Sequence, residues 1–146
     1  MAQGLRVGDV ARGAGVSTAT IRHYERIGLL PRALRTESGY RVYPAGAIDR
    51  VRLVRSGVRF GFTLRQLAAF LGIRDGGGTP CHDVRAAGQR VLDAADRELA
   101  ALQAARDEIA RTLHEWDRRL AATGAGGRAQ LLETLPDSLP ERRILR

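Results

Sequence analysis

The chain has 146 residues, 44% of them apolar, and a formal net charge of +8, which suits one compact domain with an extension. Its single cysteine, Cys81, excludes an intramolecular disulfide framework and any thiolate-only metal site within one chain. No run of about 18 apolar residues predicts a membrane span, and no signal-peptide pattern opens the sequence. We therefore expect a cytoplasmic protein without a membrane partner.

The excess positive charge lies entirely in the first half of the chain. Residues 1–74 contain 13 arginines and four acidic residues, a net charge of +9, whereas residues 75–146 contain 11 arginines and 12 acidic residues, a net charge of −1. A GC-rich coding sequence accounts for the absence of lysine, but it does not explain this asymmetry. Because the planar guanidinium group suits phosphate and guanine edges, the asymmetry indicates a nucleic-acid partner.

Two short helices are predicted at the start of the chain. Residues 5–15 carry apolar side chains at near-helical spacing, and Gly15 interrupts the pattern. Ser17 is a suitable N-cap for a second helix over 18–27, which Gly28 can end. Two short helices joined by a glycine-containing turn are typical of a helix-turn-helix, although many small helical proteins share this pattern.

Residues 31–43 have the features of a basic hairpin. Pro31 stops the preceding helix, Ser38 and Gly39 supply a tight turn, and Tyr40 and Val42 follow the alternation of a strand. A helix-turn-helix followed by a basic hairpin predicts a winged helix-turn-helix domain.

Two further helices complete this domain, which we place at residues 1–74. Pro44 suits the first turn of a helix that runs to about Val58. Thr63 is the expected N-cap of the next helix, which ends near residue 73. Its predicted buried stripe consists of Leu64, Leu67, Ala68 and Leu71. A glycine-rich linker follows at residues 75–82.

One long helix is predicted over residues 83–122, before glycines introduce a C-terminal tail at 123–146. The continuous pattern, about 38 residues, would span roughly 57 Å, far more than packing on its own small domain requires. Alternating three- and four-residue steps define a heptad seam, interrupted once at Arg106, and predict a coiled coil with a second chain. The seam consists of Leu92, Ala95, Leu99, Leu102, Arg106, Ile109, Leu113, Trp116 and Leu120.

Three stretches together resemble the MerR family of bacterial transcription regulators. They are VGDVARGAGVSTATIRHYERIGLLP at 7–31, RTESGYRVYPAGAIDRVRLVRSGVRFGFTLRQLAAFL at 35–71, and the long helix after PCHDVR at 80–85, in all about 120 residues. The resemblance implies a mainly α fold with an N-terminal winged helix-turn-helix domain and a long dimerising helix that forms an antiparallel coiled coil. It implies a homodimer that binds double-stranded DNA and works with RNA polymerase.

The resemblance also implies a mechanism. Family members bind near-palindromic operators between promoter elements that are too far apart. In an activator of this family, an effector makes the dimer bend and untwist the duplex, which realigns these elements for RNA polymerase. Such deformation costs on the order of 1–10 kcal/mol, which phosphate contacts must repay. A constitutive or repressor-only protein that has lost its effector response is the alternative.

Positions on the second helix and in the wing match residues that contact DNA in this family. The second helix is the one that enters the major groove. Tyr24 has packing against the wing as its alternative role, and we interpret Glu25 as an ion-pair partner of a nearby arginine. The expected DNA-binding residues are Thr18, Thr20, Arg22, Tyr24, Tyr40, Arg41 and Arg59.

The effector is the open question. Many family members sense metals through one cysteine at the start of the long helix and two near its end. Cys81 stands at the first position, but the second falls at Trp116 and the third at Ala129, and these side chains cannot bind a soft cation. With His82 and His114, Cys81 offers at best a sparse metal site contributed across the dimer.

Three other interpretations stay open. Trp116 could line an apolar pocket for an organic effector, or Cys81 could sense redox state because Arg85 and a helix N-terminus favour its thiolate. The effector response could also be lost. Enzymatic activity is not expected, since no catalytic or phosphate-binding motif has a convincing context. A scaffold would leave the basic half unexplained.

Overall fold

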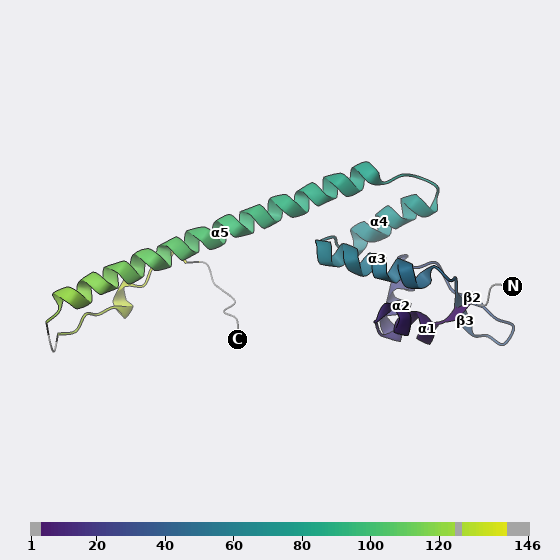
Figure 1. The fold of residues 1–146 in the computed structure, drawn as a ribbon, viewed down its shortest axis with the longest axis horizontal. Coiled ribbons are helices and arrows are strands. Elements are labelled where there is room, and N and C mark those ends of the chain that lie inside the picture. The colour runs from purple at the N-terminus through teal and green to yellow at the C-terminus, as the bar shows by residue number, and fades with distance from the viewer. Residues whose placement is uncertain (1–3, 125–126, 140–146) are drawn as a thin grey trace. The chain divides into compact units, whose positions relative to one another are not determined.

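The computed structural model describes residues 4–124 and 127–139 of a mainly helical chain (Figure 1). The chain divides into two compact units, Met1–Val91 and Leu92–Arg146, and each is described by itself. Among the described residues, no helix is long and apolar enough to cross a membrane.

The first unit contains the predicted helix-turn-helix. Helix α1 (Val7–Ala14) ends at Gly15, whose φ of +66° is a left-handed conformation that glycine adopts without strain. Helix α2 (Thr18–Arg26) begins after Ser17, whose side-chain oxygen accepts a hydrogen bond from the backbone N–H of Thr20 at 3.1 Å. The N-cap and the glycine-containing turn are therefore confirmed.

The predicted hairpin is part of a small antiparallel sheet with the strand order β1-β3-β2. Strand β2 (Leu34–Arg35) and strand β3 (Arg41–Tyr43) are joined by a turn in which Gly39 has a φ of +82°. Tyr40, which we expected within a strand, precedes β3 and lies in the turn region.

A third strand was not predicted. Leu5 and Arg6 form strand β1 (Leu5–Arg6), which pairs with β3 so that Leu5 lies opposite Tyr43. The sequence pattern had assigned these residues to the first helix. They are extended because β3 provides backbone hydrogen-bond partners on this side, a long-range pairing that apolar spacing does not reveal.

Helix α3 (Ala47–Phe60) begins later than predicted. Pro44 lies outside the helix, and its carbonyl accepts a hydrogen bond from the backbone N–H of Ala47 at 3.0 Å, which forms a turn instead of a first helical turn. Gly46 is the N-cap, and Gly61, with a φ of +119°, ends the helix.

Helix α4 (Leu64–Asp75) has the predicted N-cap. The Thr63 side chain accepts from the backbone N–H of Gln66 at 3.2 Å, and the Gln66 side chain accepts from the backbone N–H of Thr63 at 2.9 Å, which makes a capping box. Leu67 and Leu71 of the predicted stripe are buried, and the other two members pack against the core as partly buried residues.

The core of the first unit joins the helix-turn-helix to α3 and to the sheet. Contact between α3 and α4 is close, since a Cβ atom at Gly57 would lie 2.5 Å from a methyl carbon of Leu67. Burial of these side chains provides the main stabilisation of the domain. The largest fully buried side chains are those of Tyr43, Ile21, Leu29, Leu30, Val10, Val51 and Val54.

Helix α5 (Cys81–Ala122) starts two residues before the predicted beginning of the long helix and ends at the predicted residue. At 1.5 Å per residue, its 42 residues correspond to roughly 63 Å. Its first turns belong to the first unit. A Cβ atom at Gly61 would lie 2.7 Å from a methyl carbon of Val91, so α5 packs tightly on the end of α3.

The second unit consists of the rest of α5 and a C-terminal segment, residues 127–139, that contains the short 3₁₀ helix η1 (Leu132–Thr134). This segment runs back beside the end of α5 (Figure 1). The leucines of the predicted seam are each more than half exposed along α5: Leu92, Leu99, Leu102, Leu113 and Leu120.

Candidate nucleic-acid interface

Helix α2 and the wing form one surface lined by arginines. Arg22 on α2 and Arg41 at the start of β3 are both exposed, and both line two adjoining depressions of about 230 and 360 Å³. We call the cationic residues that line these depressions the arginine surface. They are Arg6, Arg22, Arg26, Arg32 and Arg41.

Sequence reasoning identified only Arg22 and Arg41 of this set. Arg26 lies one helical turn beyond Arg22, a spacing that places both on one face of α2 and could have indicated it. Arg32 directly follows the helix-turn-helix. Arg6 lies on the strand that the sequence pattern missed, and its guanidinium carbon is 4.9 Å from the centre of the Tyr40 ring, a cation–π arrangement.

The two threonines of α2 lie at its N-terminus. Thr18 is exposed, whereas Thr20 is half-buried and its hydroxyl is hydrogen-bonded to the Ser17 hydroxyl at 2.9 Å. Backbone N–H groups at a helix N-terminus favour anions such as phosphate. The start of α2 can therefore contact the same polyanion as the arginine surface.

Tyr24 and Arg59 differ from the other expected DNA-binding residues. Tyr24 is only 8% exposed and belongs to the hydrophobic core of the first unit. Contact with DNA through its remaining exposed part stays a prediction. Arg59 is exposed in the last turn of α3, where it donates to the Ser56 hydroxyl at 3.1 Å, and it does not line either depression.

Glu25 connects α2 to the wing beside the arginine surface. Its carboxylate accepts hydrogen bonds from the backbone N–H of Ala33 at 3.0 Å and from the Tyr43 hydroxyl at 2.9 Å. Our interpretation of Glu25 as an ion-pair partner of arginine is therefore corrected: Arg41 and Arg32 act on it only through their charge. The carboxylate instead satisfies two donors that would otherwise be left without partners.

The pKa values of this pair move in opposite directions. Burial raises the pKa of Glu25, but the hydrogen bonds from Ala33 and Tyr43 and the nearby positive charges outweigh it and hold the value below the ordinary one. Burial, followed by the hydrogen bond to Glu25, raises the pKa of Tyr43 to about 12. Near neutral pH the pair is therefore a charged acceptor and a neutral donor.

Three arginines of α3, Arg50, Arg52 and Arg55, donate hydrogen bonds to main-chain carbonyl oxygens of the helix-turn-helix and the residues that follow it. Arg52 donates to the carbonyl oxygen of Gly13 at 2.8 Å, and Arg55 donates to that of Ala14 at 2.7 Å, at the C-terminal end of α1. These carbonyls lack partners within α1, and cations favour this end of a helix. These bonds join α3 to the C-terminal end of α1 through the main chain.

Arg50 makes a second set of supporting bonds. It donates to the carbonyl oxygen of Leu29 and to both carboxylate oxygens of Asp75, each at 2.6 Å. These hydrogen bonds are the main reason that the pKa of Asp75 lies below its ordinary value. The sequence pattern assigned Asp75 to the linker, but this ion pair keeps it in the last turn of α4.

The expected effector residues are not brought together within the chain. Cys81 and His82 are exposed at the start of α5, and His114 is exposed in the second unit. Over residues 4–124 and 127–139 there is no group of three or more His, Cys, Asp and Glu side chains that could hold a metal ion. Trp116 is half-buried and contacts the C-terminal segment.

Comparison with known proteins decides the family. The family model "MerR family regulatory protein" matches residues 6–43, and the model "MerR, DNA binding" matches residues 48–112. The chain is 35% identical over 109 residues to "Heavy metal-dependent transcription regulator 2" of Rhizobium meliloti (strain 1021), an alignment that covers 75% of this chain and 71% of that protein. The chain belongs to the MerR family.

Other MerR-family proteins differ in what their names associate them with. The "Mercuric resistance operon regulatory protein" of Bacillus cereus is 40% identical over 80 residues, which are 55% of this chain and 61% of that protein. The crystal structure of the N-terminus of MtaN, the Bacillus subtilis multidrug transporter activator, shares 28% identity and a TM-score of 0.59 over 75% of this chain and 97% of that one.

MerR-family membership confirms three predictions of the sequence analysis. The chain is a DNA-binding transcription regulator with an N-terminal winged helix-turn-helix and a long C-terminal helix. The matched relatives are regulators of transcription, so the expectation that the chain is not an enzyme is also confirmed.

Proposed function

We propose that this MerR-family regulator binds a near-palindromic operator as a homodimer and controls transcription by distorting the DNA. The arginine surface is the observation that carries this proposal. Arg22 on α2 and Arg41 on the wing line the same two depressions, so a duplex that receives α2 in its major groove also meets the wing. Guanidinium groups from two elements can thus bind neighbouring phosphates and fix the register of α2.

The remaining DNA-binding residues have distinct roles in this proposal. Thr18 and Thr20, at the N-terminus of α2, would make phosphate and base-edge contacts in the groove. Tyr40, which is 57% exposed, extends the contact of the wing along the DNA backbone. Arg59 approaches the duplex from the end of α3, and Tyr24 contributes through the exposed edge of its side chain.

The dimer is supported by the exposed leucines of α5. A second copy of α5 in antiparallel orientation would cover the seam. Burial of such a row of apolar side chains is the usual driving force for helix pairing. A two-fold dimer presents two α2 helices to half-sites of a near-palindrome. RNA polymerase at the promoter and a cytoplasmic location belong to the same proposal.

The trigger is less constrained than the DNA contacts. The names of relatives point to metals and to multidrug transport, while the described residues of one chain hold no three-ligand group. A metal site would have to combine Cys81 and His82 of one copy with His114 of the other. The alternatives are an organic effector near Trp116, a redox response of Cys81, or a regulator without an effector.

Alanine variants of the two shared arginines test the proposal. The probe is a duplex selected by the wild-type protein from a randomised pool, and binding is measured by fluorescence anisotropy at one fixed salt concentration. Arg22→Ala and Arg41→Ala should each weaken binding at least about tenfold, because a charge-assisted hydrogen bond of about 1.5–3 kcal/mol is lost in each copy.

The matched control is Arg97→Ala, which removes an exposed arginine from α5. This variant should bind like the wild type, and circular dichroism should show that all three variants keep their helical content. If both Arg22→Ala and Arg41→Ala bind the selected duplex with wild-type affinity, the arginine surface is not the DNA contact.

A further inference from the structure

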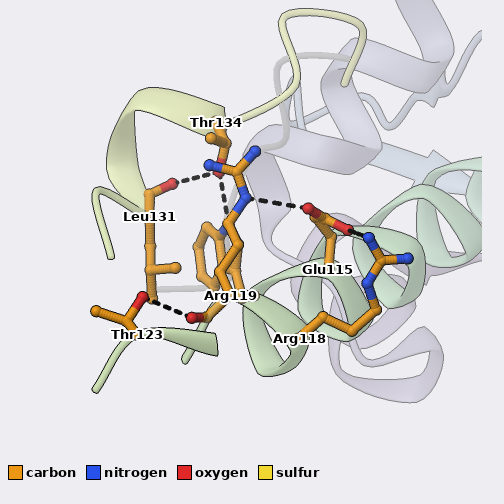
Figure 2. A network of polar contacts seen from close by, with 7 residues as sticks. Glu115, Arg118, Arg119, Thr123, Leu131 and Thr134 are labelled. Carbon is orange, nitrogen blue, oxygen red and sulfur yellow. Dashed lines mark hydrogen bonds and ion pairs between the residues drawn. The ribbon is translucent and has the colours of Figure 1, made fainter. Parts of the chain in front are cut away.

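The C-terminal segment is joined to α5 by a two-step hydrogen-bond relay (Figure 2). The indole N–H of Trp116 donates to the side-chain oxygen of Thr134 at 2.9 Å, and the Thr134 hydroxyl donates in turn to the carbonyl oxygen of Leu131 at 2.7 Å. The single hydroxyl therefore accepts from α5 and donates to the residue that precedes η1. All three residues are partly buried.

The return of the chain at the end of α5 depends on close local packing. The Thr123 hydroxyl donates to the carbonyl oxygen of Arg119 at 2.7 Å, and the backbone N–H of Gly127 donates to the carbonyl oxygen of Gly124 at 2.9 Å. A Cβ atom at Gly127 would lie 2.3 Å from the Thr123 methyl carbon. Glycine is therefore the residue that lets the segment turn back this closely.

One of the two acidic side chains that flank Trp116 along α5 is already paired. Glu115 forms ion pairs with Arg118 at 3.0 Å and with Arg119 at 3.1 Å (Figure 2). These pairs reduce its availability as a ligand.

A metal ion does not fit the donor groups at this place. The indole N–H of Trp116 is a donor only and offers no lone pair, and Ala129 has no donor atom. Soft metals require thiolate or imidazole ligands, and residues 127–139 contain neither cysteine nor histidine. His114 on α5 belongs to no group of three or more possible ligands among the described residues. The metal-binding loop that the family resemblance implies is thus replaced here by a hydrogen-bonded segment.

We infer that the C-terminal segment is held on α5 by the Trp116–Thr134 hydrogen bond and keeps this docked state without any metal ion. The docked state is a property of one chain, since every contact that supports it lies within the second unit. The inference therefore does not depend on the proposed DNA binding, and its experiment can fail or succeed separately.

The only tryptophan of the chain reports this state directly. In the full-length protein, intrinsic fluorescence and acrylamide quenching measure the exposure of Trp116, and hydrogen exchange measures the protection of residues 127–139. Thr134→Val removes the acceptor with little change of shape. It should red-shift the emission, raise the quenching constant at least about twofold and increase exchange of the segment, because the indole loses its partner.

The matched control is Thr112→Val, which removes another threonine hydroxyl of the same unit, one that donates to the Glu108 carbonyl within α5. It should leave all three signals unchanged. Trp116→Phe, which keeps an aromatic ring but lacks the N–H, should increase exchange of the segment as Thr134→Val does. Circular dichroism checks that α5 remains helical in each variant.

Metal dependence is tested on the wild type and on Thr134→Val. Wild-type protein dialysed against EDTA should give the same emission, quenching and exchange as protein supplied with one equivalent of Zn²⁺. The inference is overturned if EDTA alone reproduces the Thr134→Val signals, if Zn²⁺ restores protection to the Thr134→Val protein, or if Thr134→Val and Trp116→Phe leave exchange of residues 127–139 unchanged.

Discussion

The Glu25 carboxylate accepts two hydrogen bonds, one from the α2–β2 connection and one from the hydroxyl of Tyr43 in the sheet. Because the pKa of Glu25 is lowered in the folded protein, the charged form contributes stability above the ordinary pKa of 4.5. That contribution is lost as the pH falls through the lower, folded value. The winged domain should therefore become less stable below about pH 4.5.

Glu25→Gln should lower the free energy of unfolding at pH 7 by about 1–2 kcal/mol, because a charged acceptor of two hydrogen bonds becomes neutral. Urea unfolding at pH 7 and at pH 4 measures both effects, and the difference between variant and wild type should shrink at the lower pH. Glu37→Gln, at an exposed position in the wing turn, is the control. Equal stability of Glu25→Gln and wild type at pH 7 would contradict this role.

Single residues show what a sequence can and cannot reveal. Arg22 and Arg41 were found because they lie in a recognisable motif, and Thr63 because an N-cap leaves a local signature. Arg52 and Arg55 were missed, since they bond to carbonyl oxygens about 40 positions earlier in the chain. Every residue has a carbonyl group, so such bonds leave no trace in side-chain identity.

At the scale of elements, helix existence was easier to predict than helix bounds. Apolar spacing together with capping and proline signals identified α1 to α5, but Pro44 misplaced the start of α3 because a turn closed by its carbonyl precedes the helix. The start of α5 was predicted two residues too late, at residue 83 instead of Cys81, so the predicted linker extended into the helix. Strand β1 is only two residues long and depends on a partner nearly 40 positions away, so it was not predicted.

The seam of α5 carries the prediction for this scale. Leu102→Glu should convert the dimer to a monomer at micromolar concentration, because each copy loses an apolar contact of about 1.5–3 kcal/mol and gains a charge in the interface. Ala101→Glu introduces the same charge at an exposed neighbour outside the seam and should remain dimeric. Light scattering after size-exclusion chromatography gives the mass; a monomeric wild type would refute the coiled coil.

At the scale of the whole molecule, charge is divided unequally along the chain. The N-terminal half holds the surplus, but Arg50, Arg52 and Arg55 are engaged in internal bonds. Five other arginines make up the arginine surface. The part of the net charge that can neutralise phosphates is therefore smaller than the composition suggests, yet it is concentrated on the face that the motif predicts.

Salt dependence measures this available charge. Each neutralised phosphate contributes about −0.9 to the slope of log K against log salt, and two copies of the arginine surface should make the slope steeper than −4. Anisotropy titrations at several KCl concentrations give the value. Arg22→Ala should reduce the slope by about 2, one contact per copy, while Arg97→Ala should not change it. A flat dependence would exclude binding through phosphates.

The three arginines of α3 that support the helix-turn-helix bond to carbonyl oxygens of Gly13, Ala14 and Leu29. A main-chain oxygen is present whatever the side chain, so these bonds place no demand on the outward-facing residues of α2. The bonds that support the helix-turn-helix are therefore separate from the side chains of α2 that would determine its DNA-sequence specificity. New operator preferences can evolve, or be engineered, by exchanging surface residues of α2 while the scaffold beneath it is inherited unchanged.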